Sequence, residues 1–313
     1  MVKSKALRTT LSPAKKSRLR LYEGVWGWIL ILPGLIVILV FKILPVLAGL
    51  WISLTEWSAL SAPKYIGLAN YFHFIRDPLV PKILGNTLFY SGLSTPLTII
   101  LSLTLAVALN QKIKGIGFFR TAYYIPVITA TVAVSIIWIW LLSDYGIINT
   151  FLLNLHLVPI NFLNSTSLSL TSIVLVDVWK NMGFNIIIFL AALQDVPGEL
   201  KDAAKVDGAT QWQIFRHISL PMISPAIFFV AMMAIIGSLQ SFDLIFNMSY
   251  EHLGGPGRST STFGFYIWQN AFRYSRMGYA AALSVVLMVI LLIVTIIQWR
   301  FRKRWVFGED VLQ

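Results

Sequence analysis

Polar side chains interrupt two of the long apolar segments of this 313-residue chain. In the first of these, Asp177, Asn181 and Asn185 recur at every fourth position and therefore share one face of a helix, with Lys180 and Phe184 alongside. Ionisable groups inside a membrane span are costly, so they tend to face a cavity, a pathway or a partner. The pattern predicts a polar and aromatic stripe that lines a cavity.

A second polar group follows in the next apolar segment. It comprises Gly237, Ser238, Gln240, Ser241 and Asp243. Hydroxyls, amides and carboxylates supply paired hydrogen-bond donors and acceptors, and an aromatic ring offers an apolar face, so these side chains suit contact with a polar solute in the cavity. Two other interpretations stay open. The same side chains also hydrogen-bond neighbouring membrane helices, and Asp177 and Lys180 are spaced to pair with each other.

The polar stretch 194–221 between these segments has the pattern of a helical hairpin. Pro197 can open a helix, because the N–H that it lacks is not needed in the first turn. Gly208 ends or bends that helix, and Trp212 and Phe215 follow at helical spacing. A short hairpin with exposed aromatics, joined to apolar segments on both sides, suits docking into a groove of another protein. An ordinary amphipathic loop is the alternative.

Three runs in this stretch resemble the EAA loop of binding-protein-dependent ABC importer permeases. They are Asp202-Ala203-Ala204, Asp207-Gly208-Ala209 and Ile218-Ser219-Leu220-Pro221. The family usually has glutamate where this chain has Asp202, so the acid is kept but is one methylene shorter. The resemblance extends over most of the chain and points to the branch of maltose-type and glycerol-phosphate-type sugar permeases. A motif of this length is far more specific than a lone glycine pattern.

This resemblance implies an all-α membrane protein with the type I importer fold, six transmembrane helices and a cytoplasmic coupling loop over 194–221. The residues implied to dock an ATPase are Asp202, Ala203, Ala204, Asp207, Gly208, Leu220 and Pro221. The residues implied to lie near the sugar are Asp177, Asn181, Phe184, Gly237, Ser238 and Ser241. Lys180 and Asn185 join this pathway because they share the stripe on the first polar segment.

The resemblance also implies three protein partners: a second homologous permease subunit, an ATPase dimer and an external solute-binding protein. ATP and Mg would be held by the ATPase, and this chain would bind no cofactor or metal itself. A homodimer stays open. The solute implied is a sugar or related polyol, such as an oligosaccharide, a glycosylated osmolyte or a glycerol phosphate ester. Asp177 weighs against an anionic solute, although Lys180 could offset it.

Composition independently places the chain in a membrane. It is 57% hydrophobic and 12% charged, with a mean hydropathy of +0.74 and no cysteine. A span needs about 20 apolar residues. The segments that meet this need lie at 26–54, 83–109, 119–142, 168–193, 222–246 and 279–299. We expect Pro33 and Pro45 to bend the first of them, and one or two interfacial helices over 55–82.

The distribution of Lys and Arg predicts the orientation. The two termini and the loops on their side carry 17 of these residues, and the loops of the other side carry six. We therefore expect both termini and the loop 194–221 to be cytoplasmic, in a bacterial inner membrane. The expected domains are a basic tail over 1–25 near anionic lipid, a permease domain over 26–300 and a C-terminal tail over 301–313. The net charge of +12 then reflects topology and not a nucleic-acid surface.

Catalytic patterns are lacking. The sequence has no glycine-rich phosphate loop, and its four histidines lack the spacing of metal ligands. Asp207-Gly208-Ala209 shares letters with lipid-modifying transferases, but the further acids that such enzymes need do not follow it. A multi-pass membrane enzyme and a non-transporting scaffold subunit are the rival hypotheses. An enzyme should work alone, whereas a permease should need an ATPase.

Overall fold

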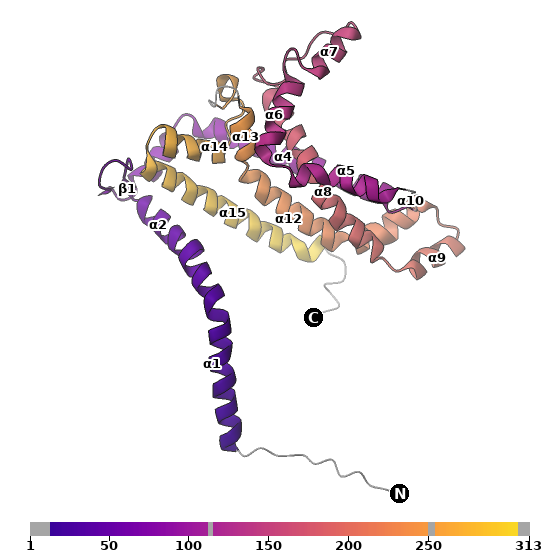
Figure 1. Ribbon diagram of the computed structural model, residues 1–313, viewed down its shortest axis with the longest axis horizontal. Helices are drawn as coiled ribbons and strands as arrows, with labels where there is room; N and C mark the ends of the chain where they lie inside the picture. Colours follow the sequence, from indigo (N-terminus) through magenta and orange to yellow (C-terminus); the bar gives the residue numbers. More distant parts are fainter. Residues whose placement is uncertain (1–12, 112–114, 250–253, 306–313) are drawn as a thin grey trace.

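The computed structural model describes residues 13–111, 115–249 and 254–305 and is built almost entirely of helices (Figure 1). The elements up to the fourth long segment are α1 (Pro13–Ile38), η1 (Leu39–Ile43), α2 (Leu44–Ile52), β1 (Thr55–Glu56), β2 (Lys64–Tyr65), α3 (Ala69–Arg76), α4 (Val80–Leu109), α5 (Ile116–Ile128), α6 (Thr131–Leu142), α7 (Ile147–Asn154) and α8 (Ser169–Gln194). The others are α9 (Gly198–Val206), α10 (Gln211–Ile214), η2 (Phe215–Ser219), α11 (Leu220–Met222), α12 (Ser224–Leu239), α13 (Asp243–Met248), η4 (Pro256–Arg258), α14 (Phe263–Trp268), η5 (Gln269–Arg273) and α15 (Met277–Trp305). Parts of the two expected tails, 1–12 and 306–313, lie outside the described residues, as do Lys112 and Lys114.

Five helical stretches in the described part are long and apolar enough to cross a membrane. They are Val25–Ile52, Val80–Leu109, Thr131–Asn154, Ser169–Gln194 and Met277–Arg302. A bent pair, Gln211–Met222 and Ser224–Leu239 with 66° between its parts, makes a sixth if it counts as one span. Four predicted segments are confirmed in position, namely 26–54, 83–109, 168–193 and 279–299. The chain is a multi-pass membrane protein.

The other two predicted segments are wrong as single helices. Range 119–142 is divided between α5 and α6, because Thr129 and Ala130 have ψ angles of 137° and 133°, outside the helical range. Range 222–246 is divided between α12 and α13, because the chain from Gln240 to Phe242 leaves the helix. Glycine and serine favour this second break, since glycine is flexible and serine offers the backbone alternative hydrogen bonds.

A π-helical turn marks the first span. The turn η1 lies just before Pro45, whose ring cannot donate a hydrogen bond to the carbonyl four residues earlier and crowds that carbonyl. One wider turn accommodates both effects. Pro33 lies inside α1, which continues through it. The irregularity expected at Pro45 is therefore a π-turn.

Helix α4 is the centre of the bundle and packs against α8 and α12. Helix α8 contributes Val178 to one apolar core and Ile186 to the next core along its length. Between them, Gly183 faces α5, and a Cβ at Gly183 would lie 2.1 Å from the carbonyl oxygen of Tyr123. Small residues let membrane helices approach closely. Gly183 therefore sets the distance between α5 and α8.

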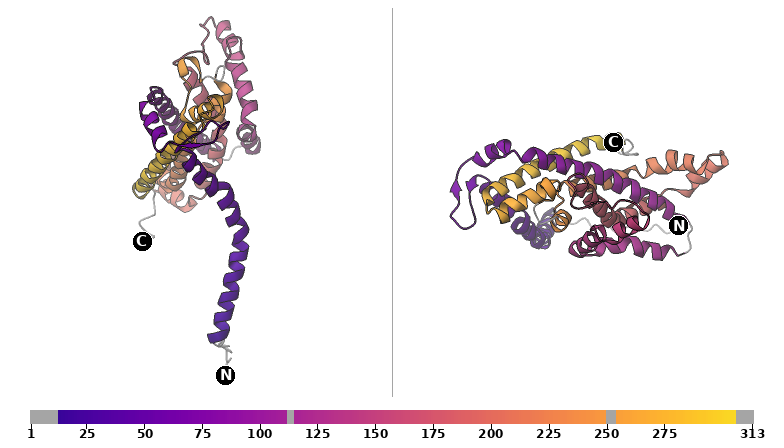
Figure 2. Two further views of the ribbon diagram at one scale, coloured as in Figure 1. Left: turned by 90° about the vertical axis from the view of Figure 1, so that its left-hand side faces the viewer. Right: turned by 90° about the horizontal axis from the view of Figure 1, so that it is seen from above.

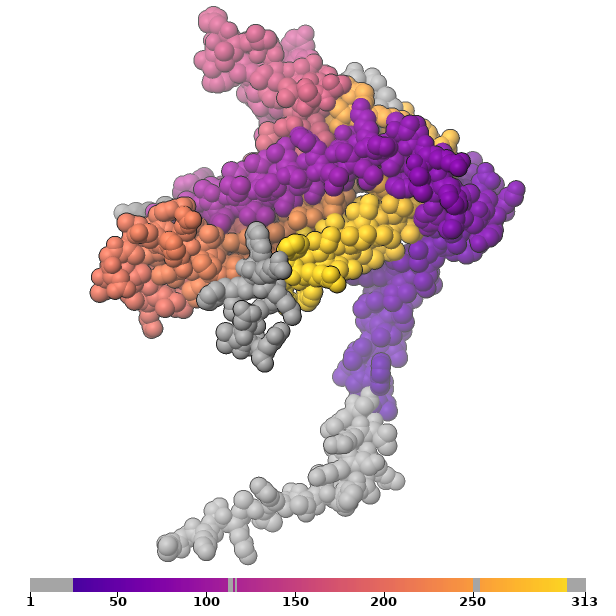
Figure 3. Space-filling view, turned by 180° about the vertical axis from the view of Figure 1, so that it is seen from behind, coloured from indigo at the N-terminus to yellow at the C-terminus, as the bar shows by residue number. Residues whose placement is uncertain are grey.

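The first span stands apart from the bundle. Figures 1 and 2 show α1 extending away from the other helices, and the space-filling view in Figure 3 shows it leaving the bundle as a separate rod. No residue from Val25 to Ile52 is buried. Only its last part, α2, packs on another long helix, α15. The apolar faces of this span therefore have little to cover them within the chain.

The segment 55–82 contains one helix, within the one or two expected, and also a strand pair that was not expected. The helix is α3, and in the antiparallel pair Thr55 faces Tyr65. Asn70 of α3 ties the two together, because its Nδ2 donates to the carbonyl oxygens of Ser53 and Thr55 at 2.8 and 2.9 Å. A buried amide that donates twice to backbone orders the segment before α4.

A buried carboxylate joins α3 to the last helices. Asp77 accepts hydrogen bonds from the hydroxyls of Tyr266 and Tyr279 and from the backbone N–H of Leu79. Burial would raise the pKa of Asp77, but these hydrogen bonds and the nearby His73 outweigh it and leave the pKa below its usual value. Asp77 is therefore an ionised structural acceptor.

Candidate functional site

A cavity of about 350 Å³ lies beside the middle of α8, and both interrupted spans border it. We call it the α8 cavity. Five predicted pathway residues line it: Asp177, Lys180, Asn181, Gly237 and Ser241. The remaining lining residues are Thr131, Gln240, Phe242, Asp243 and Leu244. Non-helical backbone at membrane depth is tolerated where it is buried in protein or lines a cavity. Thr131 follows the first break and Gln240 lies in the second, so both breaks meet this condition.

Hydrogen bonds order the α8 side of the cavity. The Nδ2 of Asn181 donates to Oδ1 of Asp177 at 2.7 Å, and the Nδ2 of Asn185 donates to the carbonyl oxygen of Asn181 at 3.3 Å. Lys180 attracts Asp177 electrostatically, but the two side chains form no salt bridge. The Asp177–Lys180 pair that the spacing allowed is therefore not formed as a direct contact, and both residues line the cavity.

Three predicted pathway residues do not line the α8 cavity. The Ser238 hydroxyl is buried and donates to the Ser91 hydroxyl of α4 at 2.6 Å. Phe184 and Asn185 lie one to two turns farther along α8, and the Phe184 side chain is exposed. Ser238 thus matches the alternative of contact between helices. Phe242, which the sequence reasoning did not select, supplies the aromatic ring of the cavity.

The sequence reasoning also missed Tyr90. This α4 side chain is completely buried against the carboxylate of Asp177 and the hydroxyl of Ser241. Tyr90 does not itself line the α8 cavity, but it lies against two residues that do, Asp177 and Ser241. The sequence offers only a weak indication of this role, because Tyr90 lies in a segment of mostly apolar residues. Hydroxyl residues at helical spacing mark that face of α4 as polar, namely Thr87, Ser91, Ser94, Thr95, Thr98 and Ser102.

At the other end of α8 the chain forms the expected hairpin. Pro197 is the N-cap of α9, and Gly208 follows α9 with a φ of +82°, a left-handed conformation that glycine adopts without strain. Thr210 then caps α10 with a capping box, in which Thr210 and Gln213 exchange hydrogen bonds between side chain and backbone. The helix continues through η2 into α11, where Pro221 lies in the first turn.

The surface of this hairpin is open. Helix α9 has no buried residue, and the Trp212 side chain is 66% exposed. Of the predicted docking residues, four are exposed, namely Asp202, Ala203, Asp207 and Gly208. The other three are half-buried, namely Ala204, Leu220 and Pro221. An ordered hairpin with an uncovered apolar and acidic surface has the properties of a docking element.

Asp202 has a partner within the hairpin. The Lys205 ammonium donates to Asp202 Oδ1 at 2.8 Å, one turn along α9. This hydrogen bond and the charge of Lys205 lower the pKa of Asp202. Both side chains are in solvent, where such a pair contributes little to stability. Asp202 is therefore held ionised and positioned, and it remains accessible.

The fold and both regions can now be compared with known proteins. The model of the family described as "Binding-protein-dependent transport system inner membrane component" matches residues 98–306. The lactose transport system permease protein LacF of Rhizobium radiobacter is 32% identical over 293 residues, which cover 92% of this chain and 98% of LacF. The probable ABC transporter permease protein YesP of Bacillus subtilis is 35% identical over 300 residues, which cover 95% of this chain and 96% of YesP. The trehalose/maltose transport system permease protein MalF of Thermococcus litoralis is 32% identical over 292 residues, which cover 92% of this chain and 98% of MalF.

Solved structures agree on the fold. A chain of a bacterial ABC transporter that imports the acidic polysaccharide alginate matches with a TM-score of 0.78 and 24% identity, over 91% of this chain and 99% of that chain. The same kind of transporter in complex with an alginate pentasaccharide-bound periplasmic protein matches with a TM-score of 0.79. The fold, the family match and the relatives agree, and this inner-membrane chain belongs to the binding-protein-dependent transport system inner membrane component family.

Proposed function

We propose that the chain is the permease subunit of an ATP-driven importer and that its pathway for a sugar or related polyol passes through the α8 cavity. The observation that carries the proposal is the meeting of two interrupted spans with the polar face of α8 at one cavity. Discontinuous helices at a midplane site are the usual design of transporters. Hydroxyl, amide and carboxylate groups beside Phe242 match the chemistry of a sugar.

The orientation follows from charge. In this proposal the chain has six spans, with Gln211–Met222 and Ser224–Leu239 as one bent span, and both termini are cytoplasmic. The excess of Lys and Arg on that side, 17 against six, supports this placement. The hairpin from α9 to α11 is then cytoplasmic, and α3, α14 and α7, the outer end of the span Thr131–Asn154, lie at the external surface.

The hairpin serves as the coupling element. A separate ATPase dimer, which holds ATP and Mg, docks on Asp202, Ala203, Ala204 and Gly208 and moves the hairpin when it closes. That motion opens the pathway alternately to the two sides. Energy must enter through the ATPase, because a solute with equal affinity for both states shifts no equilibrium. The chain itself performs no catalysis.

A second permease subunit completes the pathway. The uncovered first span, with no buried residue from Val25 to Ile52, supports such a partner, because a span left apart from its own bundle is free to pack on another one. An external solute-binding protein delivers the solute. The names of the relatives that transport lactose or trehalose and maltose support a sugar as the solute class.

The test is purification of the chain in mild detergent with its associated proteins, followed by an ATPase assay with lactose, maltose or trehalose and the external protein fraction. We expect an ATPase and a second permease to co-purify, and one sugar with its binding protein to raise ATP hydrolysis. Gly208→Asp should abolish recovery of the ATPase, because it adds a carboxylate next to Asp207 on the docking surface, while Gly198→Ala, at an open helix start in the same hairpin, should not. Recovery of the chain alone would reopen the membrane-enzyme and scaffold hypotheses.

A further inference from the structure

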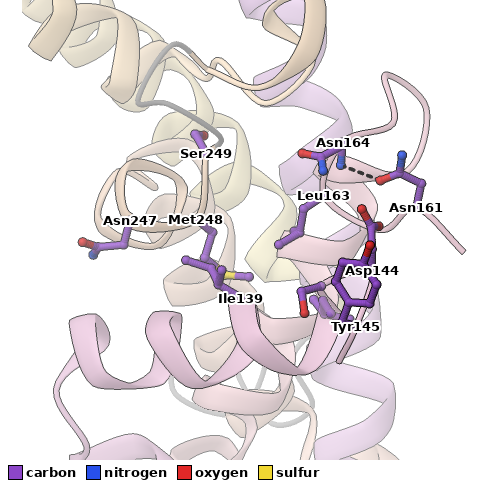
Figure 4. Close-up of a pocket in the computed structure, with 11 residues that line it drawn as sticks. Ile139, Asp144, Tyr145, Asn161, Leu163, Asn164, Asn247, Met248 and Ser249 are labelled. Carbon is purple, nitrogen blue, oxygen red and sulfur yellow. Dashed lines mark hydrogen bonds between the residues drawn. The ribbon is translucent and has the colours of Figure 1, made fainter. Parts of the chain in front are cut away.

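A second cavity, of about 440 Å³, lies at the opposite end of α8 from the hairpin (Figure 4). It forms between the end of α6, the turns at 143–145 and 161–164, and the end of α13. We call it the turn cavity. Figure 4 shows Ile139, Leu163 and Met248 converging on an apolar floor. Asp144, Tyr145 and Asn164 stand on the rim that the two turns form. Nothing in the proposed pathway uses this cavity.

The two turns are held in place, so the cavity is preformed. Asn149 of α7 is completely buried and donates through Nδ2 to the carbonyl oxygens of Ser143 and Ile160, both at 3.0 Å. Its Oδ1 accepts the Ile160 N–H at 2.8 Å. The hydroxyls of Ser169 and Ser172 bond the carbonyl oxygens of Leu163 and Phe162 at 2.7 and 3.0 Å. Preorganised walls lower the entropy cost of binding.

The rim offers polar groups that the chain does not use. Within the described residues, the Asp144 carboxylate, the Tyr145 hydroxyl and the Asn164 side-chain amide form no hydrogen bond. A carboxylate accepts hydrogen bonds at both oxygens, an amide both donates and accepts, and a phenol does either. Among the described residues, no Lys or Arg lines the cavity. An apolar floor under such a rim suits an uncharged ring that carries several hydroxyls.

One short helix connects the two cavities. Asp243 and Leu244, at the start of α13, line the α8 cavity, whereas Asn247 and Met248, at its end, line the turn cavity. The six residues of α13 span about 9 Å. The turn cavity also lies on the side that the proposed orientation places outside. A solute that enters from that side meets the turn cavity first.

We propose that the turn cavity is an outer subsite of the pathway and binds the trailing rings of an uncharged oligosaccharide whose leading ring occupies the α8 cavity. This rests on the proposed function. Charge sets the preference for an uncharged solute. Of the residues that the structure describes, three with carboxylates line the two cavities, namely Asp144, Asp177 and Asp243, against one with an ammonium, Lys180. An acidic sugar chain, such as the alginate that the solved neighbours import, is disfavoured here.

The natural absence of cysteine gives a direct test. Single variants Asn164→Cys, Ser241→Cys and Asn154→Cys report on the turn cavity, the α8 cavity and an exposed site on α7 outside both. Each full-length variant, purified with its associated proteins in lipid nanodiscs, is labelled with a membrane-impermeant maleimide. The labelling rate of each variant is measured without a sugar and then with maltotriose, raffinose, lactose or trigalacturonate.

We expect at least one neutral sugar to slow labelling about threefold or more at both Asn164→Cys and Ser241→Cys, which corresponds to about two-thirds occupancy. Trigalacturonate should protect neither, and Asn154→Cys should label at an unchanged rate. Protection of Ser241→Cys alone would overturn the outer subsite and leave the proposed function standing. Protection of neither would overturn both the subsite and the sugar pathway. Protection by trigalacturonate would overturn the preference for an uncharged chain.

Discussion

The Ser238 hydroxyl donates to the Ser91 hydroxyl at 2.6 Å and so joins α12 to α4, away from the α8 cavity that Ser241 lines three residues later. Ser238→Ala should therefore lower the stability of the chain by about 0.6 kcal/mol, the average for such contacts between membrane helices, and leave the solute affinity unchanged. Ser241→Ala should weaken solute affinity with little change in stability. Thermal unfolding in detergent and the KM of uptake separate the two effects. Equal effects of both variants on KM would contradict this assignment.

Gly208 should tolerate asparagine better than valine. Its φ of +82° is strained for a side chain with a Cβ, by about 1–2 kcal/mol, and asparagine adopts this conformation more readily than β-branched residues do. No atom crowds the position of a Cβ, so the strain comes from the backbone alone. We expect Gly208→Val to lose uptake and ATPase recovery while Gly208→Asn keeps most of both. Identical loss in the two variants would point to lost contact area instead of backbone strain.

Gly183→Ala should push α5 and α8 apart. The added Cβ would meet the Tyr123 carbonyl oxygen at 2.1 Å, and such overpacking costs about 1–3 kcal/mol. Gly92→Ala in α4 is the matched control, because nothing lies within 4 Å of its Cβ position. The measurement is the detergent unfolding temperature of each variant. An unchanged temperature for Gly183→Ala would show that the two helices separate freely.

The Asp77 network predicts how stability depends on pH. The folded pKa lies below the usual value of about 4, so Asp77 contributes stability that is present above that value and is lost as pH falls through the folded pKa. Burial and Asp77 together raise the pKa of Tyr266 to about 12, so this donor keeps its proton in that range. The unfolding temperature should fall below about pH 4 in the native chain.

Asp77→Asn tests the network directly. This variant should be less stable than the native chain at neutral pH. Its unfolding temperature should fall less below about pH 4, because the asparagine side chain has no proton to gain there. Tyr266→Phe removes one hydrogen-bond donor and keeps the Asp77 carboxylate. It should lower the unfolding temperature at neutral pH and reduce the drop in unfolding temperature between neutral and acid pH. Parallel profiles for Asp77→Asn and the native chain would mean that other carboxylates cause the acid loss.

Local rules were enough to predict the parts of the molecule with a strong sequence signal. Helical periodicity brought Asp177 and Asn181 to one face of α8, and proline and glycine chemistry set Pro197 and Gly208 at the ends of α9. These features depend on neighbours in the sequence. The docking roles of the hairpin residues remain predictions.

Features that depend on contacts between distant segments were not accessible in this way. A helix that stops at Leu239 turns Ser238 toward α4 and Ser241 toward the cavity, although a continuous helix would place them one turn apart on one side. Thr129 and Ala130 break a segment that reads as uniformly apolar. Tyr90 gains its position only when α4 packs on α8, and the periodic hydroxyl residues around it indicate a polar face but not its contact with Asp177.

The exposed first span has a consequence for biogenesis. From Val25 to Ile52 no residue is buried, so this segment draws almost no tertiary stability from its own chain. Its lifetime in the bilayer then depends on how soon another protein covers it. A cell that makes this chain in excess would accumulate an orphan with an unsatisfied helix, a natural substrate for membrane proteases. The second permease subunit proposed above would cover α1, so balanced synthesis of the two chains would limit this loss.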